Sequence, residues 1–109
     1  MKQLNFKLSS DKNPVYEETV KYLDNNGIHF LIDNYKIKVL IDEDITFIRT
    51  TKDDEFMINN NKSSFYLKKE NISLDLPIVY SSLEKRDNKI IISYQIENES
   101  PVDIIINLQ

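Results

Sequence analysis

Arg49 is the residue whose type and position point most directly to chemistry. It is one of only two arginines in a lysine-rich chain, and it keeps the parity of the apolar positions Ile45 and Phe47. This parity predicts an inward side chain, and a buried charge without a partner costs several kcal/mol, so we expect a carboxylate or carbonyl partner. Two roles follow: a structural ion pair, which we favour, or an anchor for the carboxylate of a ligand.

Aromatic residues accompany Arg49 on the same predicted inward face. The aromatic positions that mostly follow this parity are Phe6, Phe30, Tyr35, Phe47, Phe56, Phe65 and Tyr94. They can fill a small barrel or line a cavity for an apolar ligand, and the short chain favours filling. If a ligand binds, the residues expected to hold it are Arg49, Phe47, Phe56 and Tyr94.

The other titratable residues give no catalytic or metal-binding pattern. His29 is the only histidine, has outward parity and lacks a cysteine or second histidine as a partner, so we expect a surface residue. The acidic runs 42–44 and 53–55 lack the alternating ligands and glycine of a calcium loop. They are predicted to be solvated turns, and a weak cation site would require the fold to bring both to one rim. No catalytic residue, metal ligand or cofactor is expected, and nothing supports an enzyme.

Composition describes an ordinary globular protein. The 109 residues predict one domain, 1–109, with 40% hydrophobic and 29% charged residues. The sequence contains no cysteine, no signal-peptide core and no apolar run long enough to cross a bilayer. We therefore expect a cytoplasmic protein without membrane contact. The net charge of −4 and the scattered lysines disfavour a nucleic-acid partner.

Strict alternation of apolar and polar positions identifies the elements that must place these side chains. In the segment 90–96, alternate residues from Ile90 to Ile96 share one face, and the pattern resumes at 102–108 after a polar, proline-containing break. A period of two is typical of antiparallel strands with one buried face. Asn26-Gly27 predicts a type I′ hairpin turn.

The same period runs through the whole chain. It predicts short strands at 4–8, 15–23, 28–32, 35–41, 45–49, 56–58, 65–67, 72–80, 90–96 and 102–108. The inward face of 15–23 is ambiguous, and 79–86 reads as a strand or as one helical turn. Many short strands with short connections predict an all-β fold, a single small up-and-down antiparallel β-barrel of about eight to ten strands.

Three stretches carry a resemblance to a known family. "ITFIRTTKDDEFMIN", with Arg49, Phe56 and Met57, "FYLKKENISLDLPIVYSSLE", and "NKIIISYQIENESPVDIIINL", with Tyr94, resemble the YwiB-like family of small bacterial proteins. The resemblance implies a calycin-like, lipocalin-like barrel, in which an inward arginine closes one end against an aromatic residue, and it brings no established activity. Thr50 and Asn71 stand where that family usually has glycine, and this chain is shorter at its front end.

These observations lead to one expected function and one alternative. We expect a non-enzymatic binding or interaction module. The alternative is a carrier of a small apolar or carboxylate-bearing ligand in the barrel lumen, with Arg49 as its anchor. The partner is unknown, a small apolar ligand or a protein, and the chain is expected to be a monomer or a homodimer.

Overall fold

The structure is a computed structural model that describes residues 2–109. Within this range it contains strands and turns but no helix, and therefore no helix that could span a membrane. The strands are β1 (Lys2–Ser10), β2 (Asn13–Asp24), β3 (Ile28–Ile32), β4 (Tyr35–Ile41), β5 (Ile45–Thr50), β6 (Asp54–Ile58), β7 (Ser63–Leu67), β8 (Ile72–Asp75), β9 (Ile78–Arg86), β10 (Lys89–Ile96) and β11 (Val102–Leu108).

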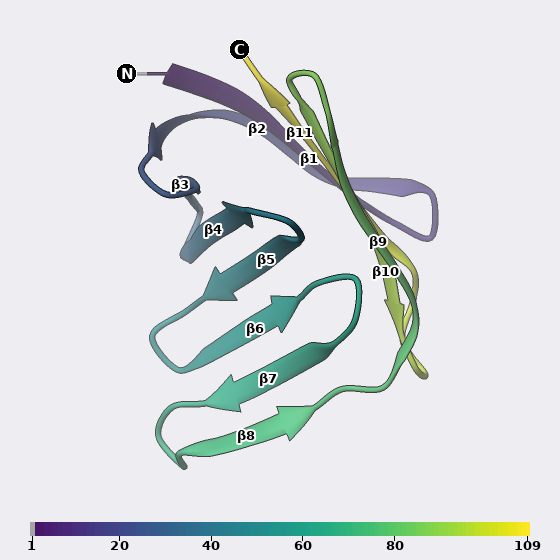
Figure 1. Ribbon diagram of the computed structural model, residues 1–109. Coiled ribbons are helices and arrows are strands. Elements are labelled where there is room, and N and C mark those ends of the chain that lie inside the picture. The colour runs from purple at the N-terminus through teal and green to yellow at the C-terminus, as the bar shows by residue number, and fades with distance from the viewer. Residues whose placement is uncertain (1) are drawn as a thin grey trace.

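All eleven strands belong to one antiparallel sheet that curls into a half-barrel (Figure 1). Its strand order is β8-β7-β6-β5-β4-β3-β2-β1-β11-β10-β9. The predicted all-β, up-and-down antiparallel fold is confirmed. The first and last strands pair, as closure of a meander requires, but β8 and β9 form the two ends of the sheet and are not paired with each other.

The strand count differs from the prediction because the expected strand 72–80 is divided at Leu76-Pro77. The N–H group of Leu76 donates to the carbonyl of Ser63 (2.9 Å), which continues the β7–β8 ladder by one residue. Pro77 has no N–H group, so the ladder stops there. Its carbonyl instead accepts from Glu97 (2.9 Å), close to the end of β10. The chain thus crosses from one end of the sheet to the other, and the ambiguous segment 79–86 is part of a strand, β9.

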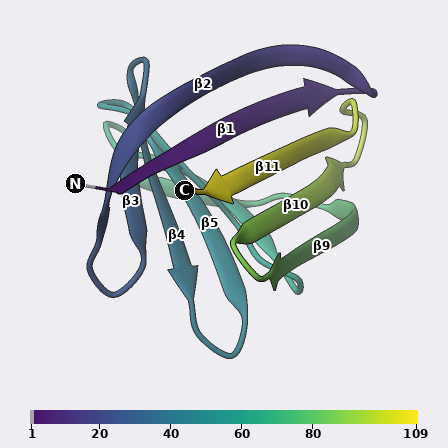
Figure 2. The same cartoon turned by 90° about the horizontal axis from the view of Figure 1, so that it is seen from above.

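The curl places two groups of strands over one another. Strands β1, β2 and β9–β11 form one layer, β3–β8 form the other, and the two layers run at a steep angle (Figure 2). The long strand β2 joins them: it pairs along β1 and reaches β3 only through Leu23 and Asp24. A register shift opposite Leu8 and Ser9 leaves Val15 without a partner on β1. Such a bulge increases bending and twist, consistent with the strong curve of β2.

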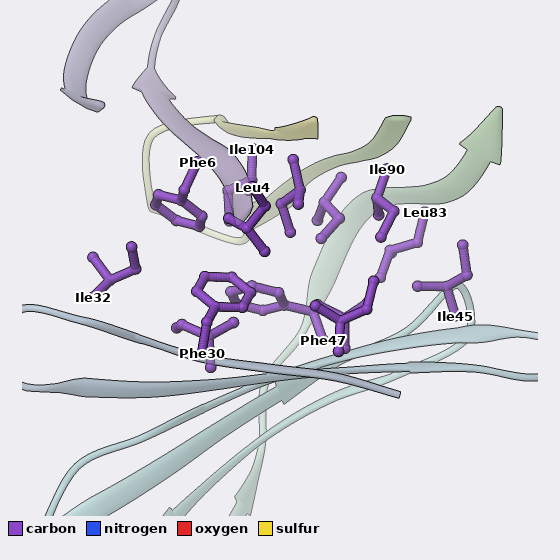
Figure 3. Packing of buried hydrophobic residues seen from close by; sticks show 14 of the residues in the cluster. Leu4, Phe6, Phe30, Ile32, Ile45, Phe47, Leu83, Ile90 and Ile104 are labelled. Carbon is purple, nitrogen blue, oxygen red and sulfur yellow. The ribbon is translucent and has the colours of Figure 1, made fainter. Parts of the chain in front are cut away.

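The core fills the space between the two layers. Leu4, Ile90 and Ile104 point down from one layer toward Phe30 and Phe47 of the other (Figure 3). The side chains that are less than 2% exposed are Leu4, Val39, Ile58, Ile90, Ile92 and Ile106. The centre of the half-barrel is therefore packed with aliphatic and aromatic side chains rather than open.

The alternation in β2 resolves the ambiguous face of that strand. Tyr22 is buried, and Tyr16 and Val20 pack partly against the core, whereas Val15 and Leu23 are exposed. The inward face therefore belongs to the parity of the tyrosines.

Two turns show how residue type sets local conformation. Asn26 (φ 55°) and Gly27 (φ 139°) both have positive φ, as expected. Pairing of Asp24 with Ile28 nevertheless leaves three residues in the loop, so the predicted two-residue type I′ turn is wrong. At the position where the resembled family has glycine, Asn71 adopts φ 56°, a left-handed conformation that asparagine tolerates better than most residues.

A side-chain clamp links the two layers near the unpaired side of the sheet. Asn60 lies in the turn between β6 and β7. Its Nδ2 donates to the carbonyl of Leu83 in β9 (3.4 Å), and its Oδ1 accepts from the N–H group of Leu83 (2.8 Å). The amide of Asn60 thus occupies both main-chain groups of one β9 residue, as a neighbouring strand would.

Candidate ligand-binding cleft

A cleft of about 350 Å³ lies at the end of the half-barrel where β2 diverges from β3. Its lining comes from β1, β2, β5, β10, β11 and the β3–β4 hairpin. The lining residues are Phe6, Leu8, Val15, Tyr16, Ile32, Asp33, Tyr35, Ile37, Phe47, Arg49, Tyr94, Val102 and Ile104. Apolar and aromatic side chains form most of these walls, and Arg49 is their only cation.

Arg49 is placed by the register of three neighbouring strands. Arg49 lies opposite Ile37 of β4 on one side and opposite Phe56 of β6 on the other. Both of these neighbours are buried. Its guanidinium carbon Cζ lies 5.2 Å from the ring centroid of Tyr35 and 5.5 Å from that of Phe56. These distances are within the range of cation–π interactions, each worth roughly 0.5–2 kcal/mol depending on desolvation. The predicted inward orientation is confirmed.

The expected polar partner of Arg49 is missing among residues 2–109. Its Nε is buried and has no hydrogen-bond partner, and no carboxylate in this range forms an ion pair with it. The expectation of a carboxylate or carbonyl partner was therefore wrong, because the strands beside β5 present aromatic rings to the guanidinium instead. A buried donor without a partner costs about 1–3 kcal/mol, so the Nε of Arg49 is a local source of instability.

The predicted residues come together at this end of the fold. Phe47, Arg49 and Tyr94 line the cleft, and Phe56 contacts both Arg49 and Tyr94, with a ring-centroid distance of 5.6 Å to Tyr94. Burial raises the pKa of the Tyr94 hydroxyl, while the positive charge of Arg49 acts in the opposite direction. Their role in ligand binding stays a prediction.

Sequence reasoning missed several members of the site. Tyr35 was recognised as inward-facing but not as a neighbour of Arg49, and Tyr16 and Asp33 were not singled out. The parity of Tyr35 in the β3–β4 hairpin was the available signal. The hydroxyl of Tyr16 donates to the exposed carboxylate of Glu18, which also lies on the inward parity of β2.

The remaining candidates lie elsewhere. The Nε2 atom of His29 is 2.8 Å from the carbonyl oxygen of Asn25, within its own hairpin. The acidic runs 42–44 and 53–55 flank β5 at its opposite ends, so they do not meet at one rim. Among residues 2–109, no group of three or more histidine, cysteine or acidic side chains could hold a metal ion.

A larger hollow of about 770 Å³ lies at the other end of the half-barrel and contains none of the predicted residues. Lys2 and Asp24 lie in its lining, 3.9 Å apart and both largely exposed. Solvated charges of both signs make this hollow a weaker candidate than the cleft around Arg49.

Comparisons with known proteins give a structural similarity but no family match. No family model matches the chain, and no curated protein matches it. Among solved structures, the chain is similar to the YwiB protein from Bacillus subtilis, with 10% sequence identity and a TM-score of 0.36. The match covers 99% of this chain and 89% of that chain. Membership in the family that the sequence resembles stays a prediction.

Proposed function

We propose that this protein is a non-enzymatic binding module whose cleft around Arg49 holds a small ligand with a carboxylate and an apolar body. The observation that carries the proposal is the guanidinium itself, which lies in a largely apolar cleft and forms no ion pair among residues 2–109. Arginine matches a carboxylate with two parallel N–H···O bonds, which are stronger when water is excluded.

The size of the cleft limits the ligand. A volume of about 350 Å³ is near the lower end of small-molecule sites, which span about 300–1,000 Å³. Because the centre of the half-barrel is packed, a ligand would lie at its mouth rather than deep in a lumen. This favours a compact aromatic or branched acid over a long-chain lipid.

A second candidate function is a protein-interaction module. Strand β8 pairs only with β7, and Ile72 and Leu74 are each 46% exposed. An edge strand with exposed apolar side chains can pair with a strand of another chain. Under this proposal, light scattering should show a dimer or a complex, and small carboxylates should have no effect on the melting temperature.

We further propose that the protein is calycin-like, bacterial and cytoplasmic. A calycin-like classification is supported by the curled antiparallel meander with paired first and last strands. A bacterial source is supported by the sequence resemblance alone. A cytoplasmic location is supported by the absence of cysteine from the sequence.

The decisive experiment is a thermal-shift and calorimetric series on the wild-type protein and two arginine variants. Benzoate, phenylacetate and octanoate are compared with their neutral amides, and the acids are expected to stabilise the protein by about 2.7 kcal/mol at 100 times the dissociation constant. Arg49→Gln should abolish this effect. Arg86→Gln is the matched control, because Arg86 is exposed and pairs with Glu84 in β9.

Arg49 is not the anchor if the acids and their amides bind equally well. The same conclusion follows if a folded Arg49→Gln protein binds the acids as well as the wild-type protein does. Absence of any stabilisation together with a dimer would favour the interaction module.

A further inference from the structure

Within residues 2–109, one edge of strand β2 is unpaired along most of its length. Its other edge pairs with β1 from Asn13 to Tyr22, whereas only Leu23 and Asp24 pair with β3. In an antiparallel ladder, alternate residues direct their N–H and C=O groups to opposite sides. The side of β2 away from β1 therefore presents main-chain donors and acceptors, and it forms the outer border of its layer (Figure 2).

This edge borders the same cleft as Arg49. Val15 and Tyr16 of β2 line the cleft from one side, and Asp33 and Tyr35 of the β3–β4 hairpin line it from the other. Val15 is also the residue left unpaired by the bulge. Bulges often occur beside binding sites, where they redirect a strand.

The charges around the cleft are arranged in a dipolar pattern. Arg49 lies inside and Asp33 lies on the hairpin turn that lines the cleft, while the exposed Glu18 accepts a hydrogen bond from the cleft residue Tyr16. A ligand that fits this pattern carries an anion at the inner end and neutral or cationic groups outside. A fatty acid would use Arg49 and the apolar walls, but it would leave both the main-chain edge and the acidic rim unused.

Resting on the proposed function, we propose that the ligand class of this cleft is an extended peptide with a free C-terminal carboxylate. Its carboxylate binds Arg49, its last side chain packs on the apolar walls near Leu8 and Phe47, and its main chain adds a strand to the edge of β2 between residues 15 and 20. Strand addition supplies affinity through main-chain hydrogen bonds, and pockets for alternate side chains supply specificity.

The first experiment selects peptides from a library of random hexapeptides displayed with free C-termini. We expect enrichment of sequences with an apolar or aromatic last residue, and of lysine or arginine further from the C-terminus. An enriched peptide is then synthesised as the free acid and as the C-terminal amide. The acid should bind the wild-type protein at least about tenfold more tightly, since charge-assisted hydrogen bonds are the strong ones.

The second experiment locates the peptide. Hydrogen exchange should show added protection of main-chain amides within 15–20 when the peptide binds, and none in this segment when benzoate binds. N-methylation of the peptide at alternate residues of one parity should abolish binding, while the other parity should tolerate it. Arg49→Gln should lose peptide binding, and Arg86→Gln should retain it.

The outcomes separate this inference from the proposed function. If benzoate binds through Arg49 but no peptide is enriched, or if an enriched peptide binds equally well as an amide, the inference is overturned and the proposed function stands. If neither benzoate nor any peptide binds, both are overturned. Protection that appears at β8 instead of β2 would also overturn the inference and would favour the interaction module.

Discussion

Replacing Asn60 with alanine tests whether its amide stabilises the link between the two layers. The substitution removes two hydrogen bonds to Leu83, one of 2.8 Å from the Leu83 N–H group and one of 3.4 Å to its carbonyl. A typical hydrogen bond contributes about 0.5–1.5 kcal/mol net, and a buried group that loses its partner costs about 1–3 kcal/mol. Leu83 is only 5% exposed, but Asn60 itself is exposed to water. Two hydrogen bonds at these values amount to about 1–3 kcal/mol. Because Asn60 is exposed to water, we expect a loss in the lower half of this range, about 1.5 kcal/mol in the free energy of unfolding.

The assay is urea unfolding followed by far-ultraviolet circular dichroism, with thermal melts alongside. A loss of this size should lower the melting temperature by roughly 6–12 °C in a domain of this length. Asn61→Ala is the matched control, because Asn61 is adjacent, has the same side chain and is exposed. If Asn60→Ala costs less than about 0.5 kcal/mol, or no more than Asn61→Ala, the clamp does not stabilise the fold and the reasoning is refuted.

Three further substitutions test the turn, the site and the core. Gly27→Ala should lower the free energy of unfolding by more than about 1 kcal/mol. Gly27 has φ 139°, and a Cβ atom there would lie 2.7 Å from the carbonyl oxygen of Val39. An unchanged melting temperature would contradict this. Burial raises the pKa of Tyr94, so the unfolded chain releases this proton first and stability should fall as pH rises above 10.0. Tyr94→Phe should flatten that slope in alkaline urea titrations, and parallel slopes would argue against the shift. Ile106→Ala should lower the free energy of unfolding by about 2–5 kcal/mol, because Ile106 is fully buried. Leu31→Ala is the control and should cost far less, because Leu31 is 63% exposed. Similar losses for both variants in urea unfolding would contradict the core assignment.

The strands and their buried faces were predictable because alternation is a local property. Ile90 and Ile92 are fully buried, while Ile91 between them is only half-buried, as their parity predicted. The division of 72–80 was not predicted, because Ile72, Leu74 and Leu76 keep one parity up to Pro77. The break is seen in the hydrogen bonds: Leu76 donates to Ser63 of β7, whereas Pro77 accepts from the N–H group of Glu97, just after β10.

The candidate site was predictable in part for the same reason. The parity of Arg49 gave its inward direction, but its aromatic partners depend on the relative register of β4, β5 and β6. The position of the cleft depends on where β2 diverges from β3, and its bulge at Val15 leaves no mark on the apolar pattern. Interactions between strands, rather than within them, decide these features.

The pairing of β1 with β11 has a consequence for the folding rate. Read from its β9 end, the sheet has the strand order β9-β10-β11 followed by β1 to β8. This is the order of the strands along the chain, except that the last three strands come first. A circular permutant that begins at Ile78, with a short linker joining residues 109 and 2, would have only sequential neighbours in its sheet. Its relative contact order would fall, so refolding in stopped-flow experiments should be faster than for the natural connectivity.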